Sequence, residues 1–142
     1  MKKCLIFLIS VLMFLFTGCG SSNSEGTAYT EVNTQEGITL SLKEETLKSS
    51  AGTFILTNDT KEAVSYGAKE YHFEQMKDGQ WQEFAGTAQA NWSEEEVALE
   101  SGASTELSYN WKTFCGNTTK GEQYRLIIFV NESPVAVEFT GA

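Results

Sequence analysis

The stretch that decides the fold is ASTELSYNW, residues 103–111. Ala103, Thr105, Leu107, Tyr109 and Trp111 alternate with Ser104, Glu106, Ser108 and Asn110. A period of two indicates a β-strand with one buried face. Val97 and Leu99 begin a preceding strand, and Ser101-Gly102 predicts a two-residue hairpin turn that joins the two.

The same alternation recurs on both sides of this stretch. It predicts strands at about 38–42, 53–57, 70–77, 80–84, 123–130 and 135–140. Asp78-Gly79 and Asn131–Ser133 predict hairpin turns, and Pro134 opens the last strand, where it need not donate a ladder hydrogen bond. Roughly seven or eight short strands without a long helical pattern predict an all-β protein, a single antiparallel β-sandwich.

The N-terminus predicts a secretion signal. Lys2 and Lys3 precede the apolar run Cys4–Phe16, whose 13 residues are too few to cross a hydrocarbon core that needs roughly 20. Thr17-Gly18-Cys19 follows and resembles the lipobox of bacterial lipoproteins. The resemblance implies that Cys19 becomes the diacylated first residue of a chain held on the extracytoplasmic face of the cell membrane. The alternative is an ordinary secretory signal with an incidental cysteine.

The chain is acidic, with 19 acidic and 10 basic side chains and a formal charge of −9. Residues 1–18 hold two of the lysines and no acid, so the remaining 124 residues carry 8 basic groups and a charge of −11. Such a charge argues against nucleic-acid binding, because the protein would have to approach a phosphate backbone. It also leaves membrane attachment to acyl chains, two of which suffice for stable anchoring.

Three segments are predicted. Residues 1–18 form the lipoprotein signal peptide, and 19–36 comprise the lipidated cysteine and a disordered tether rich in Ser, Gly, Thr, Asn and Glu. A coil of that length would hold the domain on average about 20–25 Å from the anchor and at most about 60 Å away. Residues 37–142 form the β-sandwich.

The residue inventory argues against catalysis. His72 is the sole histidine, and no Gly-x-Ser-x-Gly elbow occurs. Two isolated aspartates do not make a calcium loop, and the remaining soft or imidazole ligands are too few for a recognisable metal site. We therefore expect no enzyme activity and no cofactor. Cys115, which has no cysteine left to pair with, is expected to be a small buried hydrophobe.

Four short motifs carry a family resemblance over residues 37–140. Phe54–Asn58, Asp78–Trp81, Phe114–Gly116 after Trp111, and Gly121–Arg125 look like the bacterial immunoglobulin-like domains of small lipoproteins. Two departures from the family pattern are that Phe114-Cys115 replaces the usual tyrosine before glycine and that an extra residue separates Gly121 from Tyr124. The resemblance implies an immunoglobulin-like sandwich with no assigned catalytic residues.

The strand pattern also predicts positions for Tyr124 and for the three tryptophans. Tyr124 follows the Gly121 turn, where the tyrosine of a tyrosine corner would bond its hydroxyl to the backbone a few residues upstream. The alternative is that Tyr124 is simply an aromatic residue of the core. Trp81 and Trp111 fall at positions expected to face the core. Trp92 lies beside the acidic run Glu94–Glu96 and is either part of a solvated loop or a side chain displayed to a sugar or a protein pocket.

The strand at 124–130 is apolar on both faces. Tyr124, Leu126, Ile128 and Val130 are expected to face the core, whereas Ile127 and Phe129 fall on the other side with Met76 and Ala136. One interpretation is an exposed apolar patch that binds a partner. The other is that the protein itself covers the patch, with the tether or the Trp92 loop.

The functional prediction is a lipid-anchored, extracytoplasmic module of the bacterial envelope that acts by binding or as a structural element. The speculative binding residues are Ile127, Phe129, Met76 and Trp92. The alternative is an inhibitor or accessory subunit of an envelope enzyme or transporter. The expected partners are the membrane, through Cys19, and an unidentified envelope protein, with no nucleic acid.

Overall fold

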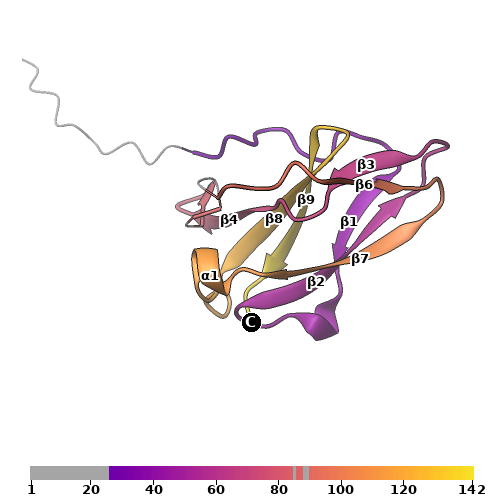
Figure 1. Ribbon diagram of the computed structural model, residues 1–142. Helices are drawn as coiled ribbons and strands as arrows, with labels where there is room; N and C mark the ends of the chain where they lie inside the picture. Colours follow the sequence, from indigo (N-terminus) through magenta and orange to yellow (C-terminus); the bar gives the residue numbers. More distant parts are fainter. Residues whose placement is uncertain (1–25, 85, 88–89) are drawn as a thin grey trace, which may run out of the picture.

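The computed structural model describes residues 26–84, 86–87 and 90–142, which form two antiparallel β-sheets packed face to face (Figure 1). The smaller sheet has the order β1-β2-β7. Its strands are β1 (Ile38–Leu42), β2 (Ala51–Asn58) and β7 (Ser104–Asn110). A single 3₁₀ turn, η1 (Glu44–Thr46), connects β1 to β2.

The larger sheet has the order β5-β4-β8-β3-β6, and β9 pairs with β8. Its strands are β3 (Val64–Gly67), β4 (His72–Lys77), β5 (Gln80–Glu83), β6 (Glu96–Leu99), β8 (Gln123–Val130) and β9 (Ser133–Thr140). One helical turn, α1 (Lys112–Cys115), separates β7 from β8. The predicted all-β sandwich is confirmed, with nine strands among the described residues.

Two hairpins form as the turn residues predict. Asp78 and Gly79 have φ angles of 51° and 76° between β4 and β5, as a type I′ turn requires. Asn131 and Glu132, with φ angles of 46° and 64°, connect β8 to β9. Because Val130 pairs directly with Ser133, the last strand begins two residues earlier than the expected Val135.

The hairpin predicted at Ser101-Gly102 is wrong. The two strands on either side of the turn do not pair: β6 pairs with β3 in the large sheet, and β7 pairs with β2 in the small one. The turn therefore carries the chain from one sheet to the other. Alternation of apolar residues identifies each strand, but it does not determine which strand lies beside it.

Trp111 lies at the centre of the core, with no exposed surface. Its ring stacks on Phe73 at 4.8 Å between centroids, and its Nε1 donates to Ser49 O at 3.0 Å. Gly52 makes room for it, since a Cβ at that position would lie 3.3 Å from the indole. The expectation that Trp111 faces the core is confirmed.

Tyr124 forms the predicted tyrosine corner. The side chain is fully buried, and its hydroxyl accepts a hydrogen bond from Thr119 N at 2.9 Å. Gln75 Nε2 donates to the same oxygen at 3.4 Å. The corner fixes the turn that leads into β8 against the core.

Asn58, which ends β2, is also fully buried. Its Nδ2 donates to the carbonyl oxygens of Glu62, Leu99 and Glu100, and its Oδ1 accepts from Thr60. This one side chain therefore connects the β2–β3 turn to the crossover between β6 and β7.

Candidate functional site

The outer face of the large sheet is where the predicted patch residues lie. Ile127 pairs with His72 of β4 on one side and with Ala136 of β9 on the other, so the three residues occupy neighbouring positions. Ile127 is nevertheless 0% exposed and Ala136 is 6% exposed. Something other than the second sheet must therefore cover this face.

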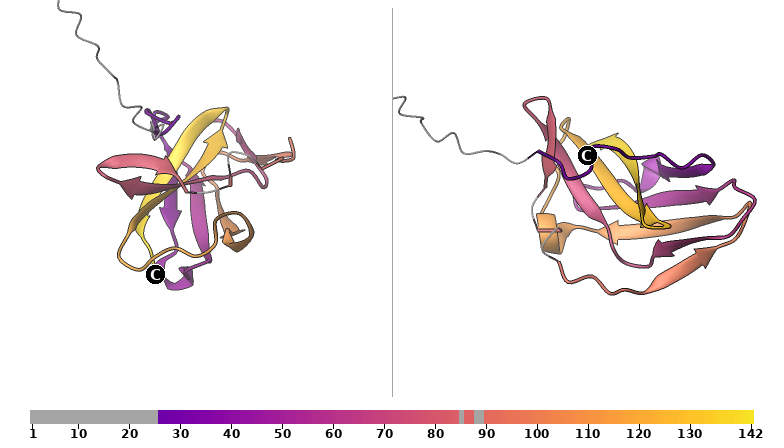
Figure 2. Two further views of the ribbon diagram at one scale, coloured as in Figure 1. Left: turned by 90° about the vertical axis from the view of Figure 1, so that its left-hand side faces the viewer. Right: turned by 90° about the horizontal axis from the view of Figure 1, so that it is seen from above.

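The cover is the chain segment 26–36, which we call the strap. It crosses the outer side of the large sheet before entering β1, as the view from above shows (Figure 2, right). Thr27 N donates to Trp81 O at 2.9 Å, Asn33 N donates to Pro134 O at 3.0 Å, and Gln35 Nε2 donates to Val130 O at 2.8 Å. The strap thus bonds in turn to β5, β9 and β8.

Asn33 pairs its side-chain amide with the backbone of β9. Its Nδ2 donates to Ala136 O at 3.1 Å, and its Oδ1 accepts from Ala136 N at 2.8 Å. The amide thereby imitates a neighbouring strand at a position where β9 would otherwise present free backbone groups. Such protection limits pairing of an edge strand with another chain.

A buried ion pair lies under the beginning of the strap. Arg125, the sole arginine of the sequence, is 4% exposed, and its Nε donates to Glu74 Oε2 at 2.5 Å. Its Nη2 donates to Thr27 Oγ1 and to Tyr29 O, and the Thr27 hydroxyl in turn donates to Glu74 Oε1. The guanidinium also lies 4.9 Å from the centroid of the Trp81 ring. A buried ion pair needs such additional hydrogen bonds to offset its desolvation, and the strap supplies three of them.

An aromatic contact holds the middle of the strap. The Tyr29 ring lies 5.4 Å from the His72 ring and 5.8 Å from the Phe129 ring, and these two rings are 5.5 Å apart. His72 Nε2 lies 3.0 Å from Glu70 Oε1. Partial burial raises the pKa of Tyr29, and the carboxylates Glu70 and Glu74 raise it further. The Tyr29 hydroxyl therefore stays neutral at physiological pH.

Of the two interpretations of the apolar patch, the structure shows the second: the protein covers the patch itself. Ile127 is internal, while Phe129 and Met76 are half-buried. The prediction of a disordered tether is wrong for residues 26–36, and residues 19–25 lie outside the described part of the chain. The core-facing position predicted for Trp81 is also wrong, because Trp81 pairs with Met76 on the outer face beside Arg125.

Trp92 does not project freely from its acidic loop. It is half-buried, its Nε1 donates to Thr87 O at 3.1 Å, and its ring lies 5.1 Å from Tyr71 and 5.3 Å from Phe114. The structure therefore does not bring Trp92 together with Ile127, Phe129 and Met76 as one surface. The exposed member of this aromatic group is Phe114, at 40% exposure.

Cys115 lies next to that group and is half-buried rather than fully buried. Burial raises the pKa of its thiol to about 12, and the carboxylate of Glu83 contributes. A thiol with a raised pKa is a poor nucleophile and a poor metal ligand at neutral pH. The cysteine therefore behaves as the small apolar residue expected.

The described residues, 26–142 apart from the gaps at 85 and 88–89, contain neither a metal-binding cluster nor a membrane-spanning helix. No group of three or more His, Cys, Asp or Glu side chains is placed to hold a metal ion. No helix in the same residues has the length and apolar character to span a membrane. Cys19, the predicted lipidation site, precedes the described residues.

Two packed antiparallel sheets, a buried tryptophan in the core and a tyrosine corner define an immunoglobulin-like sandwich. The chain belongs to the bacterial Ig-like domain family, whose model matches residues 34–140. The family match begins inside the strap, so residues 26–33 precede it. No curated protein and no solved structure matches the chain. A bacterial Ig-like domain is a surface or structural module, of a family that is generally non-enzymatic.

Proposed function

We propose that this protein is a lipid-anchored Ig-like module on the extracytoplasmic face of the bacterial envelope, where it binds a partner or serves as a structural element. The observation that carries the proposal is the position of the folded domain relative to Cys19. The strap begins at residue 26, so only six residues separate it from the cysteine. Nearly all of the chain behind the lipobox-like sequence is thus one folded domain.

The charge of the domain supports anchoring by acyl chains. The 124 residues from Cys19 onward carry 19 acidic and 8 basic side chains, so the domain as a whole is repelled by anionic lipid headgroups. Two acyl chains on one cysteine bind a membrane stably without any electrostatic help. The lipid would therefore hold the domain in place.

The proposal is tested by replacing Cys19 with serine in the full-length chain. The wild-type protein should sediment with membranes and incorporate a labelled fatty acid, whereas Cys19→Ser should be released or remain as an unprocessed precursor. Cys115→Ser is the matched control and should stay in the membrane fraction with its label. Absence of label from the wild-type protein would contradict the proposal.

A further inference from the structure

The strap connects two opposite ends of the sandwich. At its start, a Cβ on Gly26 would lie 4.0 Å from Gln80 Oε1, beside the β4–β5 turn. At its finish, Gly37 O accepts a hydrogen bond from Asp59 N at 2.7 Å, in the β2–β3 turn. The chain therefore enters the domain at one end and reaches the other before β1 begins.

We call the entry side the near end and define it as residues 44–50, 77–80 and 111–122. Thr118 N donates to Ser49 O at 2.7 Å, which joins the first segment to the third. Lys77 and Asp78 line the same surface hollow as Thr119 and Glu122, which joins the second to the third.

The far end comprises the turns at 58–63, 100–102 and 131–132. Asn58 Nδ2 donates to Glu100 O at 3.2 Å, and Ser65 N, just after the first turn, donates to Asn131 Oδ1 at 2.9 Å. These bonds place the three turns together at the finish of the strap.

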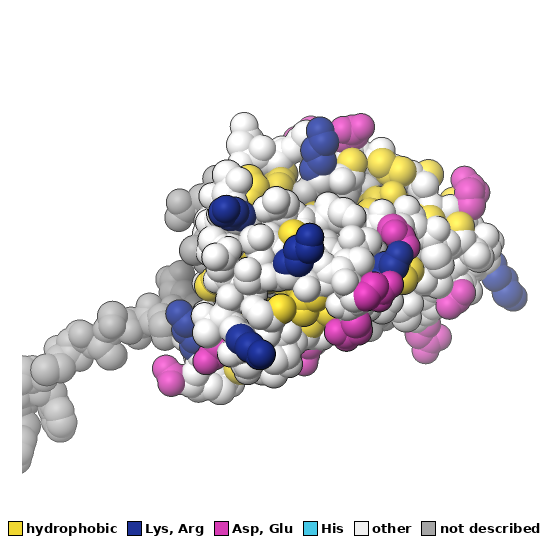
Figure 3. All heavy atoms as spheres, turned by 90° about the horizontal axis from the view of Figure 1, so that it is seen from below, with side chains coloured by type: hydrophobic (Ala, Val, Ile, Leu, Met, Phe, Trp, Pro, Cys, Tyr) yellow, Lys and Arg dark blue, Asp and Glu magenta, His cyan; other side chains and the backbone are white. Residues whose placement is uncertain are grey.

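The two ends differ in charge. The near end carries Lys48, Lys77, Lys112 and Lys120, balanced by Glu44, Glu45, Asp78 and Glu122. The far end carries Asp59, Glu62, Glu100 and Glu132 against Lys61 alone. Figure 3 shows the same asymmetry on the underside, where most lysines lie in the left half of the view and most carboxylates lie in the right half. Half of the basic groups that follow Cys19 thus lie at the near end.

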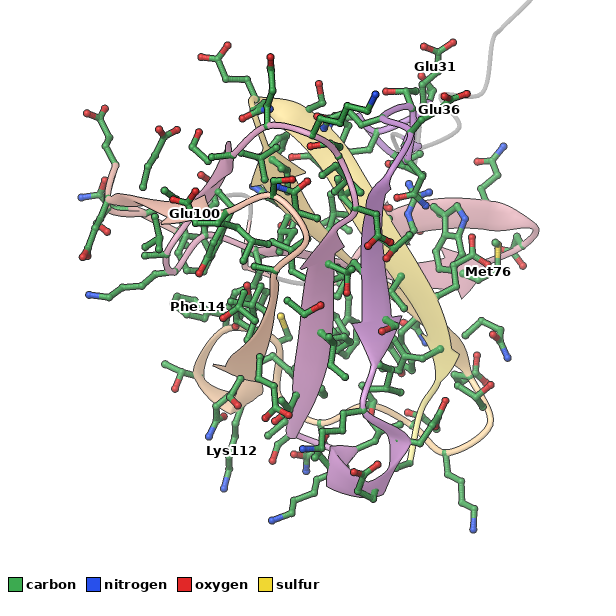
Figure 4. All side chains as sticks on the ribbon, turned by 90° about the vertical axis from the view of Figure 1, so that its right-hand side faces the viewer. Glu31, Glu36, Met76, Glu100, Lys112 and Phe114 are labelled. Carbon is green, nitrogen blue, oxygen red and sulfur yellow. The ribbon has the colours of Figure 1, made fainter. Side chains whose placement is uncertain are left out.

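The near end also displays an aromatic side chain. Phe114 is 40% exposed, and only Val97 among the large hydrophobic residues of the described chain is comparably exposed. Phe114 follows Lys112 by two residues on α1, and both side chains are labelled in Figure 4. Phenylalanine and lysine side chains occur together in segments that lie at the interface between lipid headgroups and water.

The length of the link restricts how the domain can face the membrane. Cys19 and Gly26 are separated by six residues, a chain that reaches at most about 25 Å. This is close to the length of a single eight-residue strand such as β2. An anchored domain can therefore bring its entry end to the membrane more easily than its opposite end.

We propose that the near end, with Phe114 and Lys112 at its surface, faces and contacts the anionic lipid surface that carries the anchor, while the acidic far end points away from it. This inference rests on the proposed acylation of Cys19. The energetic basis of the orientation is charge. The near end carries as many lysines as acids, so anionic headgroups repel it less than the far end, which has four acids and one lysine.

The test uses the lipidated protein reconstituted in vesicles that contain one third phosphatidylglycerol, in a Cys115→Ala background. One cysteine is introduced for a fluorophore, either Lys120→Cys at the near end or Lys61→Cys at the far end. Quenching by headgroup spin-labelled lipid should be at least threefold stronger at position 120 than at 61. Equal quenching, or stronger quenching at 61, would overturn the inference.

The variant Phe114→Ser tests whether the Phe114 side chain contacts the lipid surface or only lies near it. It should reduce quenching at position 120 at least twofold, whereas Val97→Ser, which removes the other exposed hydrophobic side chain, should leave it unchanged. An equal change in quenching at position 120 for Phe114→Ser and Val97→Ser would overturn the proposed contact between Phe114 and lipid. Flotation with the vesicles reports anchoring independently: a protein that does not float overturns the proposed function and this inference together, whereas a floating protein with equal quenching overturns the orientation alone.

Discussion

At the scale of single residues, two buried polar side chains, Tyr124 and Asn58, hold loops through hydrogen bonds made inside the domain. The Tyr124 hydroxyl accepts from Thr119 N, and Asn58 serves two turns at once. Each of them holds a loop that has little apolar surface of its own. The loops of the sandwich are thus fixed from inside the core.

Tyr124→Phe should lower the free energy of unfolding by about 1 kcal/mol or slightly more, because Thr119 N loses its acceptor. Tyr124→Ala should cost several kcal/mol, since it also opens a cavity in the core. Urea denaturation of the two variants beside the wild type measures both. A phenylalanine variant as stable as the wild type would mean that the hydroxyl contributes nothing.

Cys115 should react slowly with alkylating agents. At pH 8 a thiol with a pKa of about 12 has on the order of a thousandth of the thiolate of an ordinary cysteine near 8.5. Because the pKa is higher in the folded state, this group destabilises the fold as the pH rises above about 8.5, where the unfolded thiol loses its proton first. Iodoacetamide labelling of the chain from residue 20 onward, folded and in urea, tests this. Equal labelling rates in the two conditions would contradict the raised pKa.

Sequence reasoning worked for residues whose roles are local. The hairpin at Asp78-Gly79 and the corner at Tyr124 follow from the φ angles and the strand position that those residues require. The burial of Asn58 could not be predicted, because its partners Leu99 and Glu100 are more than 40 residues away. The face of Trp81 cannot be predicted, because an edge strand of four residues gives too little alternation to define one.

At the scale of elements, the sequence offers docking of the strap as only one of two interpretations of the apolar patch and predicts no contact of the strap's own residues. The strap has no apolar periodicity, since it binds the sheet through backbone groups, two side-chain amides, a hydroxyl and one aromatic ring. The sequence feature that indicates a cover over this face lies in the strands of the large sheet, and not in residues 26–36. An apolar outer face with an arginine in the middle of β8 needs a cover that brings hydrogen-bond acceptors.

The aromatic contact between strap and sheet gives a direct test. Tyr29→Ser and Phe129→Thr should each reduce the free energy of unfolding by about 1–3 kcal/mol. The double variant should cost less than the sum, with a coupling of about 0.5–1.5 kcal/mol, because the two rings contact each other.

Glu31→Gln, on an exposed residue of the same strap, is the control and should change stability by less than about 0.5 kcal/mol. Thermodynamic cycles from urea denaturation supply these values. Strict additivity of Tyr29→Ser and Phe129→Thr would mean that the strap does not rest on Phe129.

At the scale of the whole molecule, the docked strap changes the relation between domain and anchor. The composition of residues 20–36 predicted a coil that holds the domain on average about 20–25 Å from Cys19 and at most about 60 Å away. The strap takes up residues 26–36, and the six residues that remain reach at most about 25 Å. The same strap buries Ile127 and leaves Phe129 and Met76 half-buried.

Amide hydrogen exchange across residues 26–36 is the measurement that tests this account most directly. In the chain from residue 20 onward, the amides of Thr27 and Asn33 should exchange much more slowly than those of an unstructured peptide, because they donate to Trp81 O and Pro134 O. Tyr29→Ser should accelerate exchange at both while leaving the amides of β2 protected. Exchange of Thr27 and Asn33 at the rates of a free chain would show that the strap is not docked, and would return residues 26–36 to the role of a flexible tether.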